Sequence, residues 1–402
     1  MRIAYITPYQ GATLVKRRPI VHNRSMSNRI KIELIASLLC DNSLEVEIIS
    51  QGEVVDHSLT FYPSFSEPEP FDPRIPIYYG SALPIRRLNG LWSSARTLQI
   101  FKKRHRSKPY DLVIIFNMKG PEVACANHAI RRLCLPVILE YEDDSFVDVQ
   151  GQEVSGLAAR RSSHAATQLL SSVSGCIGVS PHLLSQLPSN IPKLLLRGVV
   201  GADIISASEQ WRGRKENVVL FSGTHTFSNG VGELIRGWRE LQMPGWQLHI
   251  TGYGRLTDEL RRSAQDTPGV VFHGLVSRPE LVRLMCSAAI CINPHVVSRT
   301  PGNVFAFKII EYLAAGAHVI STPMGTLEND IEAGITYMPD NCPATIATTL
   351  RKVIEEREWT RNSTEAAQQR YGPESVRKSL NALIGQVHTA ATTGAKSLRA
   401  GE

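Results

Sequence analysis

The chain alternates short apolar runs with amphipathic segments, and it does so in two successive series. The first series of apolar runs lies at Arg2–Thr7, Leu44–Ser50, Asp111–Asn117, Pro136–Tyr141 and Gly175–Val179. Segments with helical spacing separate these runs, at Ser25–Leu39, Leu91–His105, Pro121–Leu133 and Leu157–Ser172. Runs that are apolar throughout, such as LVIIF, are typical of strands buried on both faces of a parallel sheet. The alternation therefore predicts βαβ architecture.

The same pattern starts again after Arg197–Gly213. Its apolar runs lie at Asn217–Gly223, Trp246–Gly252, Val270–Gly274, Ala289–Pro294 and His318–Thr322. We therefore predict an α/β protein of two facing Rossmann-like domains, residues 1–198 and 199–371, with a deep cleft between them. In such sheets ligands bind at the carboxyl ends of the strands, so the cleft is the expected site.

Three segments depart from this pattern. Gln51–Asn89 is rich in Pro, Ser and aromatic residues, and we interpret it as a long loop. Residues 372–388 have helical spacing and are predicted to form a C-terminal helix that packs back on the first domain. Residues 389–402 are small and polar, which predicts a disordered tail.

Composition narrows the class of protein. Of the 402 residues, 43% are hydrophobic. No apolar run approaches the length of about 18 residues that is needed to span a bilayer. The seven cysteines show no C-x-x-C spacing, which favours a cytoplasmic protein with reduced thiols and no metal. The net charge of +7 is concentrated in the first half, at Lys16–Arg18, Arg86–Arg87 and Lys102–Lys108. No nucleic-acid-binding signature accompanies it, which leaves an anionic membrane or phosphorylated partner, or a solvated face.

The segment RTPGNVFAFKIIEYLAAGAHVIST, residues 299–322, carries the most chemistry. It predicts a helix over Val304–Ala315 with Asn303 as its N-cap and Gly316 at its end. Phosphates bind readily at such a helix start, and Lys308 would add a cation. Glu311 shares its face and could accept hydrogen bonds from a ribose diol. The alternative is a surface Lys–Glu pair on an ordinary amphipathic helix.

This segment resembles the donor-binding helix of GT-B glycosyltransferases, specifically the retaining family-4 group. The group's pattern is Glu, seven residues, Glu, then small residues, Gly and an apolar strand. The resemblance implies that Glu311 contacts the ribose of a nucleotide sugar. Asn303 stands where the group has its first Glu, which contacts the donor sugar.

Other segments resemble the group in the same order. They are LFSGTHTFSNG, LHITGYG and VVFHGLV, together with an opening RIAYITP and its loop. The resemblance implies a nucleotide-sugar site that contains Gly223, Thr224, Gly252, Gly274, Val276, Asn303, Val304, Phe305 and Glu311, with Gly11 as a phosphate-loop candidate. Asn229 occupies the position where the group usually has a diphosphate-binding Lys. Whether Lys308, Arg299 or His225 compensates is left open.

A cluster of acids, Glu140, Glu142, Asp143 and Asp144, lies at the carboxyl end of the predicted strand, in VILEYEDDSF. Carboxylates at the end of a strand could orient an acceptor hydroxyl or assist its deprotonation. We therefore select Glu142 and Asp143, with Lys308, as catalytic candidates. The alternatives are an acidic loop that caps the next helix, or a metal site. The metal reading is set aside because enzymes with the GT-B pattern usually need no metal.

The sequence thus predicts a glycosyltransferase that takes a nucleoside diphosphate sugar as co-substrate and needs no cofactor. Transfer would be to a hydroxyl of a glycan or lipid-linked acceptor, with retention, in the cytoplasm or at the inner face of the membrane. Two alternatives stay open: a nucleotide-sugar epimerase of the same fold, and a degenerate protein that binds nucleotide sugars without catalysis. The sequence specifies neither the sugar nor the base.

Overall fold

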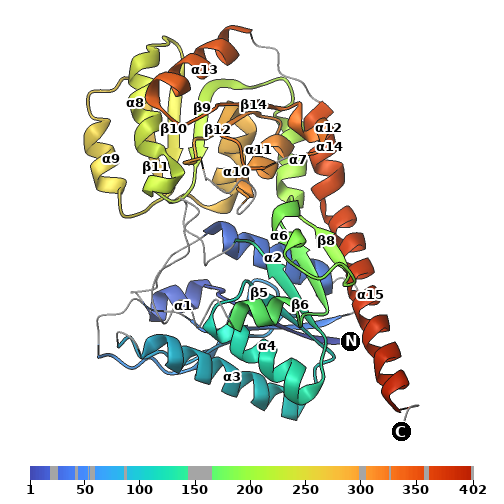
Figure 1. The fold of residues 1–402 in the computed structure, drawn as a ribbon. Coiled ribbons are helices and arrows are strands. Elements are labelled where there is room, and N and C mark those ends of the chain that lie inside the picture. The colour runs from blue at the N-terminus through green and yellow to red at the C-terminus, as the bar shows by residue number, and fades with distance from the viewer. Residues whose placement is uncertain are drawn as a thin grey trace. The chain divides into compact units, whose positions relative to one another are not determined.

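The computed structural model describes residues 1–18, 26–40, 44–52, 54, 59–85, 88–143, 165–297, 305–325, 327–356 and 362–399. These residues form two compact units (Figure 1). The first unit contains the described residues up to Leu196 and those from Val376 onward, and the second contains Arg197–Ser375. The division falls two residues before the predicted boundary.

The described part of the first unit contains an eight-stranded sheet with the order β3-β4-β2-β1-β5-β6-β7-β8. Its strands are β1 (Arg2–Thr7), β2 (Glu45–Ser50), β3 (Phe65–Ser66), β4 (Ile77–Tyr79), β5 (Leu112–Phe116), β6 (Val137–Tyr141), β7 (Gly175–Gly178) and β8 (Lys193–Leu195). All neighbours are parallel except β3 and β4. Its helices are α1 (Ala12–Arg17), α2 (Met26–Cys40), α3 (Asn89–Ser107), α4 (Gly120–Leu133), α6 (Pro181–Ser185) and α15 (Pro373–Arg399).

The interpretation of Gln51–Asn89 as a loop is wrong in part. The segment contributes β3 and β4, and β4 extends the sheet by pairing with β2. These strands have only two and three residues, too few to show a period. Burial of Ile75, Ile77 and Tyr79 fixes the segment instead. Of the predicted helix Leu157–Ser172, the structure describes residues 165–170 as helical.

The described part of the second unit contains a parallel six-stranded sheet with the order β11-β10-β9-β12-β13-β14. Its strands are β9 (Glu216–Ser222), β10 (Gln247–Thr251), β11 (Val270–Gly274), β12 (Ala288–Asn293), β13 (His318–Ser321) and β14 (Ile335–Tyr337), the last of which the sequence did not reveal. Its helices are α7 (Ala202–Gln210), η1 (Phe227–Asn229), α8 (Val231–Leu241), α9 (Thr257–Ser263), α10 (Arg278–Ser287), α11 (Lys308–Ala314), α12 (Asn329–Glu332), α13 (Pro343–Glu356) and α14 (Asn362–Tyr371).

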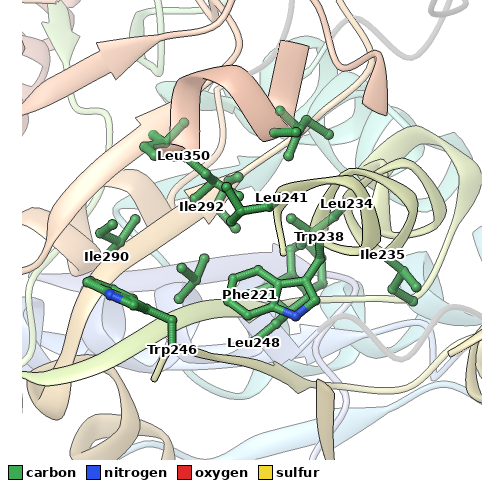
Figure 2. Close-up of a cluster of buried hydrophobic side chains, with 14 of the residues drawn as sticks. Phe221, Leu234, Ile235, Trp238, Leu241, Trp246, Leu248, Ile290, Ile292 and Leu350 are labelled. Carbon is green, nitrogen blue, oxygen red and sulfur yellow. The ribbon is translucent and has the colours of Figure 1, made fainter. Parts of the chain in front are cut away.

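A hydrophobic core lies between this sheet and helices α8 and α13 (Figure 2). The strands contribute Phe221, Leu248 and Ile290, and α8 contributes Leu234 and Trp238. The strand order runs in opposite directions on either side of β9 and β12, so these two strands flank a topological switch point. Ligands bind at such points in open α/β sheets. The predicted α/β class with two Rossmann-like domains is confirmed.

The end of the chain differs from its predicted disorder. Helix α15 continues through residues 389–399, which include three alanines, Lys396, Leu398 and Arg399, and these residue types are good helix formers. Its apolar side chains at Val376, Leu380, Leu383, Ile384 and Val387 are all buried. A Cβ at Gly175 of β7 would lie 2.6 Å from Val387 Cγ2, so the helix packs closely on this strand. Among the described helices, none is long and apolar enough to cross a membrane.

Candidate functional site

Three glycines follow neighbouring strands of the second unit and lie at one edge of its sheet. Gly223 N–H donates to the Thr251 carbonyl at 3.1 Å, and Gly252 N–H donates to the Gly274 carbonyl at 2.8 Å. All three have positive φ, and a Cβ at Gly252 would lie 1.9 Å from the Gly223 carbonyl oxygen. The chain therefore presents bare backbone at the carboxyl ends of β9, β10 and β11, where Gly223, Gly252 and Gly274 lie. Glycine suits a place where backbone must approach a ligand closely.

The loop from Gly223 to Gly230 is held by the side chain of Asn229. Its Nδ2 donates to the Thr224 carbonyl at 2.8 Å and to Thr226 Oγ1 at 3.1 Å. Gly230 follows with φ +67, and a Cβ there would lie 1.8 Å from the Pro294 carbonyl oxygen. Asn229 occupies the position where the resembling group has a diphosphate-binding Lys. Here its side chain fixes the conformation of the loop instead.

His225, in the same loop, does not replace that Lys as a cation. The ring is fully buried and its Nδ1 lies 2.9 Å from Thr257 Oγ1. Burial lowers the His225 pKa to about 4, so the imidazole is neutral near pH 7. Arg299, the other alternative, lies outside the described residues.

Helix α11 begins at Lys308, so the prediction of a helix from Val304 is wrong. Phe305 and Phe307 are both buried, and a Cβ at Gly198 would lie 2.4 Å from the Phe307 ring. These aromatic side chains pack the segment before the helix. The predicted phosphate-binding amide of Phe305 therefore precedes the helix, while Asn303 and Val304 lie outside the described residues. The predicted end holds: Gly316 has φ +76, and its N–H donates to the Leu313 carbonyl.

Lys308 places an ammonium beside Gly223. Its Nζ lies 4.5 Å from the centroid of the Phe221 ring and 3.0 Å from the position of a Cβ on Gly223. The Nζ is buried and has no hydrogen-bond partner among the described residues. Burial lowers the Lys308 pKa to about 8, so the group remains mainly charged at pH 7. Lys308 thus places a cation without a hydrogen-bond partner in the described chain next to the glycine that follows β9.

Glu311 lies one helical turn further along α11 and is 5% exposed. Its Oε1 accepts a hydrogen bond from Arg278 Nη1 at 2.8 Å, and Arg278 Nε donates to Asp203 Oδ2 at 2.8 Å. Burial raises the Glu311 pKa, and Arg278 opposes this rise. Since Glu311 pairs with Arg278 and both side-chain ends on α11 are buried, the alternative of a surface Lys–Glu pair is wrong.

Gly274 and Val276 lie in the short connection from β11 to α10. Gly274 has φ +69, and its carbonyl accepts from Thr251 Oγ1 at 2.9 Å. Val276 is half-buried. Ser277 caps α10, with Oγ accepting from Glu280 N–H at 3.4 Å. The cap fixes where α10 starts, and therefore where Arg278 lies.

The acids of the first unit separate into two environments. Glu140 lies inside β6 and is fully buried, with Tyr5 donating to its Oε2. Glu140 therefore lies within the predicted strand and not in the acidic loop that the alternative reading offered. Lys31 of α2 lies 3.6 Å from Glu140 Oε1 and also binds Glu142. Burial raises the Glu140 pKa to about 7.

Glu142 and Asp143 directly follow β6 and are held by Asn117. Asn117 Oδ1 accepts from Glu142 N–H at 2.7 Å, and its Nδ2 donates to Asp143 Oδ1 at 3.3 Å. Asn117 itself has φ +57 at the end of β5. Asp144 lies outside the described residues, and the described ranges contain no group of three or more potential metal ligands.

Gly11 is the N-cap of α1, and its N–H already has a partner. It donates to Tyr79 Oη at 3.1 Å, and Tyr79 donates to Glu67 Oε2 at 3.1 Å. A Cβ at Gly11 would lie 2.6 Å from both oxygens. The glycine is therefore required by close packing within the first unit.

Comparison with known proteins identifies the second unit. Residues 216–356, which contain the three glycines, Lys308 and Glu311, match the family described as Glycosyl transferases group 1. The second unit is a group 1 glycosyltransferase domain. No curated protein sequence matched the chain.

Solved structures extend the likeness of this glycosyltransferase to the whole chain. Sucrose-phosphate synthase from Thermosynechococcus elongatus has a TM-score of 0.73 at 17% identity, over 97% of this chain and 100% of the other. HepE from Anabaena in complex with UDP-glucose has 0.62 at 13% identity, over 96% and 99%. The lipopolysaccharide outer core galactosyltransferase WaaB has 0.58 at 15% identity, over 96% and 99%. The chain has the GT-B fold.

Sequence reasoning missed several polar residues of the glycosyltransferase. Arg278, which binds Glu311, precedes it by 33 residues, and Lys31 precedes its partner Glu142 by 111 residues. Asn117 is an ordinary strand-end residue in the sequence. These contacts depend on tertiary structure, and no spacing rule predicts them. A partial signal existed only for Arg278, which lies between Ser277 and Pro279, two residue types that are common at the start of a helix.

Proposed function

We propose that this group 1 glycosyltransferase transfers a glycosyl group from a nucleoside diphosphate sugar to a hydroxyl, with retention at the anomeric carbon. The observation that carries the proposal is the unpartnered Lys308 ammonium beside Gly223, with the buried Glu311 one turn away. A cation at the switch point suits a diphosphate, and a carboxylate suits a ribose diol. HepE, a protein of similar fold, was solved with UDP-glucose, which makes UDP-sugars the first donors to test.

The chemistry requires stabilisation of the leaving diphosphate. As the bond between the anomeric carbon and the phosphate oxygen breaks, negative charge grows on that oxygen. Lys308, held in place before the reaction, would stabilise this charge in a site with little water. In a front-face reaction the acceptor oxygen bonds to the same face of the carbon. The acceptor proton then passes to the departing phosphate oxygen, and no separate base is needed.

Glu142 and Asp143 are our candidates for orienting the acceptor. Their backbone and side chain are fixed by Asn117, while Lys31 binds the Glu142 carboxylate. Carboxylates held in this way suit several hydroxyl groups, so we propose a glycan or a lipid-linked saccharide as the acceptor. Since Lys308 can stabilise the leaving group, we propose that neither a metal nor another cofactor is required.

A donor panel tests these proposals. UDP-, GDP- and ADP-sugars are incubated with the protein, with and without mixed glycan acceptors and EDTA. We expect acceptor-dependent release of one nucleoside diphosphate that survives EDTA. Isomerisation of the donor sugar without an acceptor would indicate an epimerase, and tight binding without turnover would indicate a degenerate binder. Loss with EDTA and rescue by Mn²⁺ would contradict metal independence.

Glu311→Ala provides the residue-level test of the donor site. Loss of a charge-assisted hydrogen bond to ribose should weaken nucleotide binding by about 1.5–3 kcal/mol. Calorimetry with the preferred nucleotide measures this loss. Glu356→Ala, which removes an exposed carboxylate of α13, is the control and should bind normally. Equal affinities for wild type and Glu311→Ala would remove Glu311 from the site.

We also propose weak attachment of helix α3 to anionic membranes. Lys103 and Arg106 are exposed on this helix, and Leu88 and Leu91 are 51% and 72% exposed at its start. The basic run Lys102–Lys108 is less available to anionic lipid than its sequence indicates, because Arg104 binds Glu47 and Lys108 binds Glu45. Arg86–Arg87 lie outside the described residues.

With two exposed cations at about 1 kcal/mol each, attachment should be weak and released by salt. Sedimentation with anionic liposomes at low and high salt measures it. The double variant Lys103→Glu/Arg106→Glu should sediment less than wild type at low salt. A wild-type protein that stays in solution at low salt would end the proposal.

A further inference from the structure

Arg278 joins two carboxylates that lie on different helices. It is the first residue of α10, and it contacts Asp203 of α7 and Glu311 of α11. Nη1 lies 2.8 Å from Glu311 Oε1, and Nε lies 2.8 Å from Asp203 Oδ2. A planar guanidinium held at two edges has little freedom to rotate. The position of Arg278 is therefore fixed from both sides.

The exposure of these three side chains decreases toward Glu311. The Asp203 side chain is 45% exposed, that of Arg278 is 25% exposed and that of Glu311 is 7% exposed. A carboxylate as buried as Glu311 is costly to keep charged unless a cation pairs with it. Burial acts to raise the Glu311 pKa, and the Arg278 charge and hydrogen bond act to lower it. Arg278 is thus the group that favours the ionised carboxylate.

Other charged side chains surround α11 without the same effect. The elements packed against it carry Asp203 and Glu209 on α7, His318 on β13, and Glu365 and Arg370 on α14, while α11 itself carries Lys308. Of the charged groups around Glu311, Arg278 and Asp203 are those that influence its pKa, and Asp203 acts in the opposite direction to Arg278. The cationic influence on Glu311 therefore comes from Arg278.

We propose that Arg278 is a positioning residue for nucleotide recognition: it holds Oε1 of Glu311 so that the ionised carboxylate presents Oε2 to the ribose hydroxyls. Asp203 orients Arg278 from the other side. The inference rests on the proposed function, which assigns Glu311 to the ribose. It predicts that Arg278 governs recognition of the two hydroxyls without contacting the nucleotide. A purely structural tie between helices would have no such selectivity.

The test compares UDP with 2′,3′-dideoxyuridine diphosphate, which lacks both hydroxyls, by calorimetry. Wild type should bind UDP at least about tenfold more tightly, the value of one charge-assisted hydrogen bond. Arg278→Met should bring this ratio close to one. Arg283→Met, on the same helix, breaks an exposed ion pair with Glu280 and should keep the wild-type ratio. If GDP or ADP binds instead of UDP, the corresponding dideoxy pair is used.

The pH dependence of the same ratio gives a second measurement. Titration of the nucleotide phosphate affects both ligands and cancels in the ratio. Arg278→Lys keeps the positive charge but loses the planar guanidinium that contacts both carboxylates. Its ratio of UDP affinity to dideoxy-UDP affinity should therefore fall between those of wild type and Arg278→Met. In Arg278→Lys the Glu311 pKa should rise, so the ratio should fall as pH decreases over a range where wild type is constant. This variant also serves if Arg278→Met does not fold, as judged by circular dichroism.

The outcomes separate the two proposals. A wild-type protein that binds none of the three nucleoside diphosphates contradicts the proposed function. A wild type that binds UDP and dideoxy-UDP equally removes Glu311 from the ribose and the positioning role with it. An Arg278→Met variant that keeps a wild-type ratio of tenfold or more overturns the positioning role alone. Equal weakening of both ligands in Arg278→Met also overturns it, because that result indicates a structural tie.

Discussion

At the scale of single residues, Lys308 is charged in a place where the described chain gives it no hydrogen-bond partner. The face of Phe221 offers a weak attraction to the cation, which does not replace a full counter-ion. Keeping a buried, unpaired cation costs stability. Such a cost is expected at a functional site, where an anionic ligand supplies the missing charge.

The charge of Lys308 predicts how nucleotide binding depends on pH. Because its pKa is lowered to about 8, the ammonium is present below this value and is lost as pH rises through it. A bound diphosphate stabilises the cation, so the midpoint in the complex should lie above that of the free protein. UDP affinity should therefore fall by about tenfold or more between pH 7.5 and pH 10, measured by calorimetry.

Two variants check the assignment of this titration. Lys308→Met should bind UDP weakly at all pH values and show a flat profile over this range. Lys352→Met, which removes an exposed lysine of α13, should keep the wild-type profile. A Lys308→Met protein with the wild-type slope would assign the pH dependence to another group.

Residues close together in the sequence were the ones that sequence reasoning could assign. Lys308 and Glu311 were selected because three-residue spacing places them on one helical face and because their segment resembles a donor-binding helix. Arg278 and Asn229 were not assigned their contacts, since these depend on how α10 and the loop after β9 fold. His225 had been left open as a cation, and only its burial shows that it is neutral.

At the scale of elements, the carboxyl edge of β9, β10 and β11 is shaped by backbone contact. Gly223 and Gly252 approach so closely that no Cβ fits between them. The long central strands were predictable because their apolar runs are continuous. The short strands β3, β4, β8 and β14 have two or three residues, and pairing at the edges of the sheets defines them. The start of α11 was predicted four residues early because the packing of Phe305 and Phe307 outweighs local helix propensity.

Close contact at this edge predicts a large difference between two glycine substitutions. Gly252→Ala adds a Cβ 1.9 Å from the Gly223 carbonyl oxygen at φ +123, which should destabilise the second unit by about 3 kcal/mol or more. Gly245→Ala also has a positive φ, of +80, but nothing lies within 4 Å of its Cβ, so it should cost only about 1–2 kcal/mol. Thermal unfolding followed by circular dichroism compares the two. Equal losses would contradict the contact between the strand ends.

At the scale of the whole molecule, the first unit is assembled from both ends of the chain. Its sheet comes from residues before Leu196, while α15 from Val376 onward comes from residues after the second unit. Val387 of α15 lies against Gly175 of β7, where only a glycine leaves enough space. The sequence predicted this helix from its apolar spacing, but spacing alone does not identify the strand it covers.

Truncation should separate the buried apolar residues of α15, Val376 to Val387, from the residues that follow them. Removal of residues from Val376 onward deletes five buried apolar side chains and should raise hydrogen exchange in β7 strongly. Removal from Thr389 onward keeps all five and should leave exchange in β7 unchanged. Mass spectrometry measures both, with β9 and β10 of the second unit as internal references. Unchanged protection of β7 in the shorter protein would contradict the packing.

The contact between Val387 and Gly175 also determines when the first unit can be completed during synthesis. A ribosome makes β7 about 200 residues before it makes Val387, at roughly 5–20 residues per second. During the intervening 10–40 seconds, the apolar surface that α15 will cover has no partner from its own chain. The nascent first unit should therefore depend on a chaperone for longer than the nascent second unit, whose described residues all lie within Arg197–Ser375.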